Sequence, residues 1–114
     1  MSALSSQVRL WYWQRMSAAV LAACTLVHLG IIIYAVRGGL SAAQILGRTQ
    51  GSIAFGLFYA SFVLACAVHV PIGLARMMQE TLDWSDRLVW TVAGLFGALL
   101  LVTGLVAVYG VVRT

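Results

Sequence analysis

Three long apolar segments, separated by short polar connections, constrain the fold of this chain more than any other feature. They run over residues 16–36, 53–75 and 88–112. Each is long enough to cross the hydrocarbon core of a bilayer, which takes about 20 helical residues. A helix satisfies its own backbone hydrogen bonds in lipid, and the alternation typical of strands is absent. The sequence therefore predicts an all-α integral membrane protein, with one transmembrane domain over residues 1–114.

The composition argues against a soluble domain. Hydrophobic residues make up 62% of the 114 residues and charged residues only 9%, whereas about 25% of residues are charged in typical soluble domains. A soluble chain of this size could not bury so much apolar area. The net charge of +4 is scattered over the connections, which argues against nucleic-acid binding. Cys24 and Cys66 lie inside the apolar segments without metal-site spacing, so no disulfide is expected.

The polar parts of the chain suggest how it sits in the membrane. Residues 1–15 form a polar and aromatic lead that is typical of the membrane–water interface. In the first connection, Ser41 could cap a short surface helix. The side of the membrane with the N-terminus and the second connection has four arginines, and the other side has three. This small excess favours a cytoplasmic N-terminus.

Small residues recur at four-residue spacing in the third apolar segment. They form the pairs Ala93 with Gly97 and Gly94 with Ala98. Such pairs allow two membrane helices to approach closely, although glycine is also common in membrane helices generally.

Two histidines, His28 and His69, are the candidate functional residues inside the apolar segments. An ionisable side chain within a membrane span is costly and often marks a functional site. Neutral imidazole is a good ligand for haem iron, which favours a haem b protein. The alternative is a histidine that only forms a hydrogen bond between helices. Proton relays usually involve carboxylates within the membrane, and these segments contain none.

Helical periodicity places each histidine on a stripe of related residues. On the second segment the stripe comprises Phe62, Cys66, His69, Gly73, Arg76 and Glu80, and on the first it comprises Ser17, Leu21, Cys24 and His28. Gly73 leaves room beside a flat ring, and Arg76 could pair with a haem propionate near the water boundary. Small residues beside each histidine suit a bulky planar cofactor and also suit plain helix packing.

The depths of the two histidines limit how haem could bind. His28 lies about 20 Å from the boundary at Arg15, and His69 about 10 Å from the same side at Arg76, at 1.5 Å per residue. The two ligands of one haem should lie at similar depth. We therefore expect His28 and His69 to serve different haems, or only one of them to bind haem. Another chain would supply the second ligand, for example in a homodimer with a six-helix bundle and two stacked haems.

Two short motifs resemble a known family. The stretch WQRMSAAVL resembles the His-Arg-x-Ser-Gly entry to the first helix of the cytochrome b membrane-anchor subunits of succinate dehydrogenases and fumarate reductases. The stretch HVPIGLARMMQE resembles the second-helix pattern of that family, a haem-ligand His followed by Gly, a basic residue and an acid. The sequence departs at Gln14, where the family often has His, and at Ala75, where it often has Arg.

The resemblance implies roles for individual residues. His69 matches the haem ligand of the family, and Glu80 matches its acid on the cytoplasmic side. Arg15 and Ser17 match residues near the quinone and the haem propionates. His28 resembles the first-helix histidine of the di-haem fumarate reductase type, in which the two histidines bind different haems. The candidate quinone residues are Arg15, Ser17, Gln14 and Trp13.

The resemblance also implies a function. Such a subunit lies in the bacterial inner membrane, anchors a flavoprotein and an iron–sulfur protein, and passes electrons between them and quinone. The dicarboxylate chemistry of this enzyme complex takes place in another chain. The second connection would be the docking surface, unless it is only a solvated charged loop; its candidate contact residues are Glu80, Asp83, Trp84 and Asp86.

Two alternatives remain open from the sequence. A haem b anchor could serve a hydrogenase or another dehydrogenase, and a haem-free helical scaffold could dock or stabilise a partner. A transporter is disfavoured because no charged path crosses any segment and no inverted repeat is visible.

Overall fold

The computed structural model describes residues 3–114, which form helices and connections without any strand. The helices are α1 (Ala3–Gly38), α2 (Ala42–Thr49), α3 (Ile53–Thr81) and α4 (Asp86–Val112). Helices α1, α3 and α4 are each long and apolar enough to cross a membrane. The prediction of an all-α protein with three helices long and apolar enough to span a membrane is therefore confirmed.

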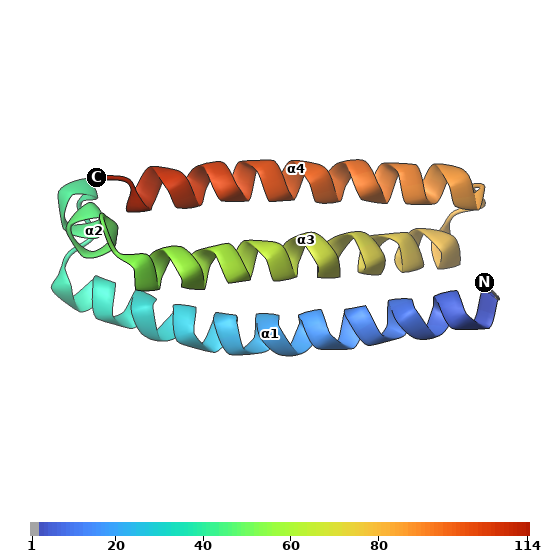
Figure 1. Ribbon diagram of the computed structural model, residues 1–114, viewed down its shortest axis with the longest axis horizontal. Coiled ribbons are helices and arrows are strands. Elements are labelled where there is room, and N and C mark those ends of the chain that lie inside the picture. Colours follow the sequence, from blue (N-terminus) through green and yellow to red (C-terminus); the bar gives the residue numbers. More distant parts are fainter. Residues whose placement is uncertain (1–2) are drawn as a thin grey trace.

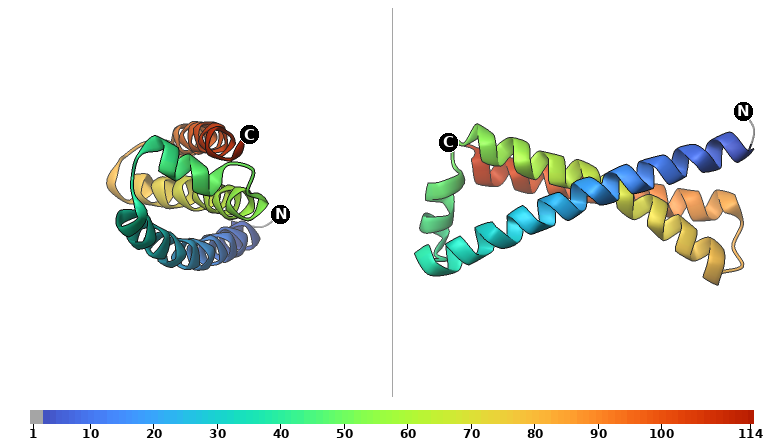
Figure 2. Two further views of the ribbon diagram at one scale, coloured as in Figure 1. Left: turned by 90° about the vertical axis from the view of Figure 1, so that its left-hand side faces the viewer. Right: turned by 90° about the horizontal axis from the view of Figure 1, so that it is seen from below.

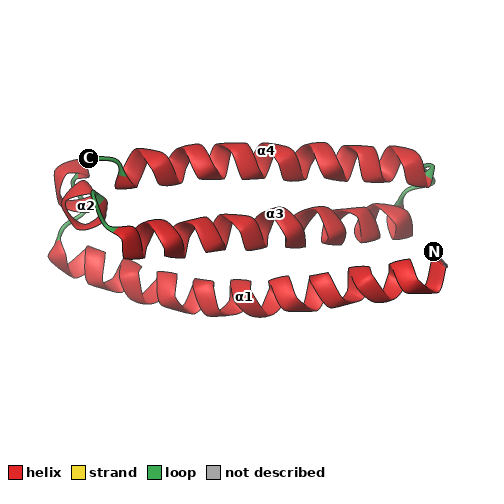
Figure 3. Ribbon diagram, in the orientation of Figure 1, coloured by secondary structure: helices red, strands yellow, loops and turns green. Residues whose placement is uncertain are grey.

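Helix α3 lies between α1 and α4 and packs against both of them (Figures 1 and 3). Helix α1 crosses α3 at an angle, which the view from below makes plain (Figure 2). The N-terminal end of α1 and the α3–α4 connection lie at one end of the bundle, while α2 and the C-terminus lie at the other (Figure 1). The longest dimension is 50 Å, which is slightly more than the 40–45 Å or so of a bilayer with its headgroups.

Serine caps begin the three later helices. The Ser41 side chain accepts a hydrogen bond from the Gln44 backbone, and the Gln44 side chain accepts one from the Ser41 backbone. This reciprocal capping box stabilises a helix as short as α2, and it confirms the predicted cap. Ser52 and Ser85 cap α3 and α4 without a reciprocal bond, each side chain accepting a bond from a backbone N–H of the first turn.

Two helices extend beyond the apolar segments from which they were predicted. Helix α1 already begins at Ala3, within the predicted polar lead, and α3 continues past Ala75 to Thr81. The hydropathy pattern indicates where the apolar part of a helix ends. The helix itself continues for as long as the following residues favour helical backbone angles. Arg, Met, Gln and Glu are good helix formers, so α3 continues into the polar region.

Helix α4 meets α3 through small residues on one face. Ala93 and Gly97 are buried, and the Gly97 backbone lies directly against Pro71 of α3. A Cβ at Gly104, two turns further along, would lie only 2.6 Å from Val63 Cγ1. Gly94 faces open space. Of the two small-residue pairs in this segment, Ala93 with Gly97 therefore packs against α3, and the pair that contains Gly94 faces outward.

The glycine contacts predict a matched set of stability changes. We expect Gly97→Ala and Gly104→Ala each to lower the free energy of unfolding in detergent by about 1–3 kcal/mol, because the added methyl overpacks the α3–α4 contact. Gly94→Ala and Gly110→Ala have open space around the new methyl and should leave stability unchanged or slightly raised. Circular dichroism during denaturation would measure all four variants. Equal effects for the two pairs would contradict the packing described here.

Candidate functional site

The two histidine stripes predicted from periodicity face each other across the α1–α3 interface. Ser17 and Cys24 of α1 are buried. The rings of His28 and Phe62 approach edge to face, with centroids 5.8 Å apart. At the other end of the stripe, Gly73 of α3 lies against the Gln14 side chain of α1. Both histidines consequently lie between these two helices.

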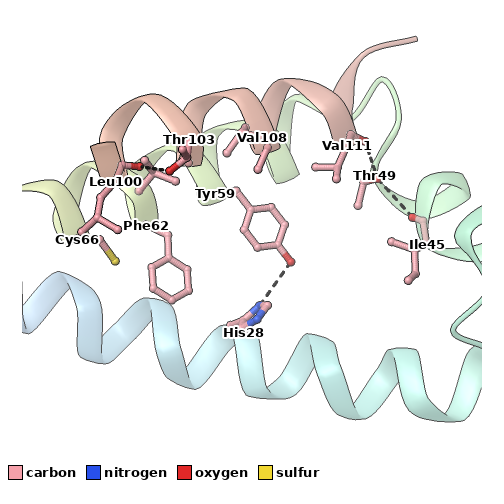
Figure 4. A pocket seen from close by; sticks show the side chains of 13 residues that line it. His28, Ile45, Thr49, Tyr59, Phe62, Cys66, Leu100, Thr103, Val108 and Val111 are labelled. Carbon is pink, nitrogen blue, oxygen red and sulfur yellow. Dashed lines mark hydrogen bonds between the residues drawn. The ribbon is translucent and has the colours of Figure 1, made fainter. Parts of the chain in front are cut away.

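His28 lies beside a cavity of about 520 Å³ near the α2 end of the bundle (Figure 4). Its Nδ1 is 3.5 Å from the Tyr59 hydroxyl, and its ring meets the Tyr59 ring edge to face. All four helices contribute to the walls of the cavity. Small residues of α4, including Gly104 and Ala107, also line the cavity.

The cavity is lined mainly by apolar groups, and its other hydroxyl groups are already bonded. Thr49 Oγ1 donates to the Val111 carbonyl at 2.6 Å, and Thr103 Oγ1 donates to the Leu99 carbonyl at 2.7 Å. Thus the polar groups that line the cavity and could meet a bound molecule are the imidazole of His28, the hydroxyl of Tyr59 and the free thiol of Cys66. Among residues 3–114, Nε2 of His28 forms no hydrogen bond, and an imidazole nitrogen of this kind is a common ligand of haem iron.

His69 is half-buried and lies beside Ser17 of α1. Its Nδ1 is 3.4 Å from Ser17 Oγ, and Ser17 Oγ also lies 3.1 Å from the Gln14 carbonyl. A serine has a single O–H donor. If it donates to the carbonyl, the serine oxygen accepts a bond from Nδ1–H of His69. In that tautomer Nε2 keeps its lone pair, which is the form of imidazole that binds a metal.

The expected room beside Gly73 is occupied. A Cβ at Gly73 would lie 3.2 Å from Nε2 of Gln14, so the amide side chain fills the space that a flat ring would need. The cavity beside His28 is lined by neither His69 nor Gly73. A planar group could therefore reach His69 only from another side of the imidazole or after Gln14 moves.

The two histidines share one arrangement at different heights. Each Nδ1 faces a hydroxyl group of the neighbouring helix, and within residues 3–114 neither Nε2 forms a hydrogen bond. His28 is level with Tyr59, which is ten residues before His69 on α3, so the histidines are separated by about 15 Å along the bundle. This separation confirms the prediction that they do not lie at one depth.

The candidate quinone residues are divided by the structure. Arg15 and Gln14 line a cleft of about 200 Å³ together with Arg76 and Trp11. Ser17 is instead buried beside His69, and Trp13 is 53% exposed and does not line the cleft. Gln14 Oε1 is buried without a hydrogen-bond partner in the described part of the chain.

The candidate docking residues lie at the same end as this cleft. Glu80 is exposed on the last turns of α3, Asp83 and Trp84 are exposed in the connection, and Asp86 begins α4. Gln79 Nε2 donates to Asp86 Oδ1 at 3.4 Å across the connection. The acidic side chains therefore form an exposed group on one end of the bundle.

Sequence reasoning missed Tyr59 and the contribution of α2 and α4 to the cavity. Tyr59 precedes Phe62 by three residues and continues the stripe that includes His69, so its periodicity could have identified it. The roles of Thr49 and Gly104 depend on how distant helices meet, and no local pattern signals such a contact.

The hydroxyl of Thr49 holds α2 against the end of α4, where the last carbonyls lack helical partners. We expect Thr49→Val to lower the free energy of unfolding by about 1–3 kcal/mol, because it leaves the Val111 carbonyl without this donor. Thr103→Val is the matched control, since Thr103 lines the same cavity but bonds within its own helix. Thermal unfolding in detergent would compare them, and equal losses would contradict a capping role for Thr49.

Comparison of the chain with protein-family models, with curated proteins and with solved structures finds no match. The assignment of a function therefore depends on the residues and geometry of the chain itself.

Proposed function

We propose that this protein is a haem b-binding membrane subunit that passes electrons within a larger respiratory complex. The observation that carries the proposal is the arrangement shared by its two histidines within the membrane-spanning helices. Each directs Nδ1 at a hydroxyl group of the adjacent helix and leaves Nε2 without a hydrogen bond. A histidine that ligates a metal usually donates its other ring N–H to an oxygen acceptor, and a hydroxyl oxygen can accept such a bond.

The surroundings of His28 fit a haem. The cavity has a volume of about 520 Å³. Its α4 wall runs from Leu100 to Val111, which is about 16 Å at 1.5 Å per residue, a suitable length for a porphyrin. His28 would ligate the iron through Nε2, and Tyr59 would hold the imidazole in position. The haem supplies one-electron redox chemistry, and the apolar walls would exclude water and so influence its potential.

His69 is the second proposed iron ligand, and it serves a different haem because of its height. Its hydrogen bond to Ser17 favours the tautomer with a free Nε2. Each haem would take its second ligand from another membrane subunit. A second copy, related by a two-fold axis along the membrane normal, would pair each histidine with its counterpart in a six-helix bundle. Helices α1 and α4 both pack on α3, and this leaves other faces of the bundle free to meet a second subunit.

The resemblance to cytochrome b subunits of succinate dehydrogenases and fumarate reductases suggests the complex. The partners would be an iron–sulfur protein and a flavoprotein on the cytoplasmic side of a bacterial inner membrane, with quinone as the electron carrier. The exposed acidic side chains and Trp84 at the α3–α4 connection support a docking surface at that end. The dicarboxylate chemistry would lie in the partner chains.

A haem-free scaffold is the second candidate function, and one observation favours it. Both histidines already make interhelical contacts, His28 with Tyr59 and His69 with Ser17. Such contacts could stabilise the α1–α3 pair without any cofactor. The scaffold would then only anchor or stabilise a partner.

Reduced-minus-oxidised spectra of the protein purified in mild detergent would test the proposal. We expect a haem b spectrum with an average of one haem per chain. His28→Ala and His69→Ala should each remove about half of the haem and a different spectral component, because each deletes the ligand of one centre. Thr103 lines the His28 cavity but is not a proposed ligand, so the Thr103→Val variant should keep both spectral components.

The other outcomes would change the assignment. Loss of haem in only one histidine variant would make the protein a mono-haem subunit and leave the other histidine as a packing residue. A colourless native protein would exclude haem binding and favour the scaffold.

A further inference from the structure

A second candidate binding site lies at the end of the bundle opposite α2. We call it the arginine cleft and define it by the residues that line its space of about 200 Å³: Leu10, Trp11, Gln14, Arg15, Ile72 and Arg76. An adjoining space of about 400 Å³ shares Trp11 and Arg76 and continues along Leu4 and Val8. Arg76 is seventeen residues from Tyr59 on α3, so the cleft lies about 25 Å from His28 along the bundle.

The two arginines of this cleft have no acidic partner. Within residues 3–114, the guanidinium of Arg15 lies over the Trp11 ring at 5.4 Å, and Arg76 forms neither a hydrogen bond nor an ion pair. No carboxylate lines the cleft. Two guanidinium groups beside one small space repel each other, and an anion between them would replace this repulsion with charge-assisted hydrogen bonds. The cleft therefore selects an anionic ligand over a neutral one.

The walls of the cleft select a ligand that also has an apolar part. Leu10 and Ile72 flank the arginines, and Leu4 and Val8 extend the apolar wall along α1. Trp11 is 62% exposed, which suits an aromatic ring at the level of the lipid headgroups. A molecule with a negative head and apolar tails is the component that a bilayer presents at this depth, and basic pockets between spanning helices bind such headgroups.

We propose that the arginine cleft binds an anionic phospholipid. Arg15 and Arg76 pair with the phosphate oxygens, and an acyl chain lies along the apolar wall of α1. Guanidinium groups suit this contact because their donors match the geometry of phosphate oxygens. The bound lipid then joins the start of α1 to the end of α3 and stabilises this end of the helix pair.

The test uses the full chain purified in a neutral detergent. Native mass spectrometry would count retained phosphatidylglycerol or phosphatidylcholine with the same acyl chains, and circular dichroism would give the thermal midpoint with each lipid. We expect preferential retention of phosphatidylglycerol and a higher midpoint with it. The variant that combines Arg15→Gln with Arg76→Gln should bind phosphatidylglycerol roughly tenfold more weakly, since it loses two charge-assisted contacts.

Matched controls separate this site from general charge effects and from haem. Arg87→Gln removes an arginine at the same end but outside the cleft, and it should keep the preference for phosphatidylglycerol. His69→Ala should keep it as well, because the lipid does not require a haem. Failure of haem binding would consequently leave this result unchanged.

Three results would overturn the proposal. One is that the native protein retains the two lipids equally and is stabilised equally by both. This result does not depend on whether any variant folds. Another is an equal loss of preference in Arg87→Gln. The last is full stabilisation by inorganic phosphate in the absence of lipid, which would make the cleft a site for free phosphate.

Discussion

Helices that lie in lipid gain little by moving apolar side chains from lipid onto one another, so their contacts depend on close packing and on polar groups that need partners. In this chain α3 provides both kinds of contact. Its Val63 and Pro71 meet glycine residues of α4, and its Tyr59 and His69 meet polar side chains of α1. The positions of both histidines follow from the central place of α3.

The α3–α4 interface is close-packed, whereas the α1–α3 interface contains the candidate binding residues. Against α4, Gly97 and Gly104 allow such close approach that a single added methyl would clash. Against α1, Gly73 meets the end of a flexible glutamine side chain, whereas the α4 glycines meet the ring of Pro71 and the branched side chain of Val63. The α1–α3 interface has polar contacts and a space at each of its ends. The α3–α4 pair is the close-packed support, and α1 completes both candidate sites.

Much of this fold could be predicted because the hydropathy of a single segment is enough to indicate a membrane helix. The three apolar segments, the Ser41 cap and the two histidine stripes all follow from periodicity and spacing within one helix. The partners of the histidines could not be predicted in the same way. Whether His69 meets Ser17 depends on the rotation and register of two helices that are far apart in the sequence. The occupation of the space beside Gly73 by Gln14 is a further result of that register, and the sequence pattern had suggested an open space there.

The heights of the two histidines connect this fold to the proposed electron transfer. Two ligands of one haem must lie at the same level, whereas a path for electrons across a membrane needs redox centres at successive levels. His28 is level with Tyr59 and His69 with Ser17, so one copy of this chain cannot supply both axial ligands of a haem. In the proposed haem protein, it would supply one ligand at each of two levels. Any haem held by two histidines therefore requires a second membrane subunit, and in such an assembly the staggered positions would arrange the two haems along the membrane normal.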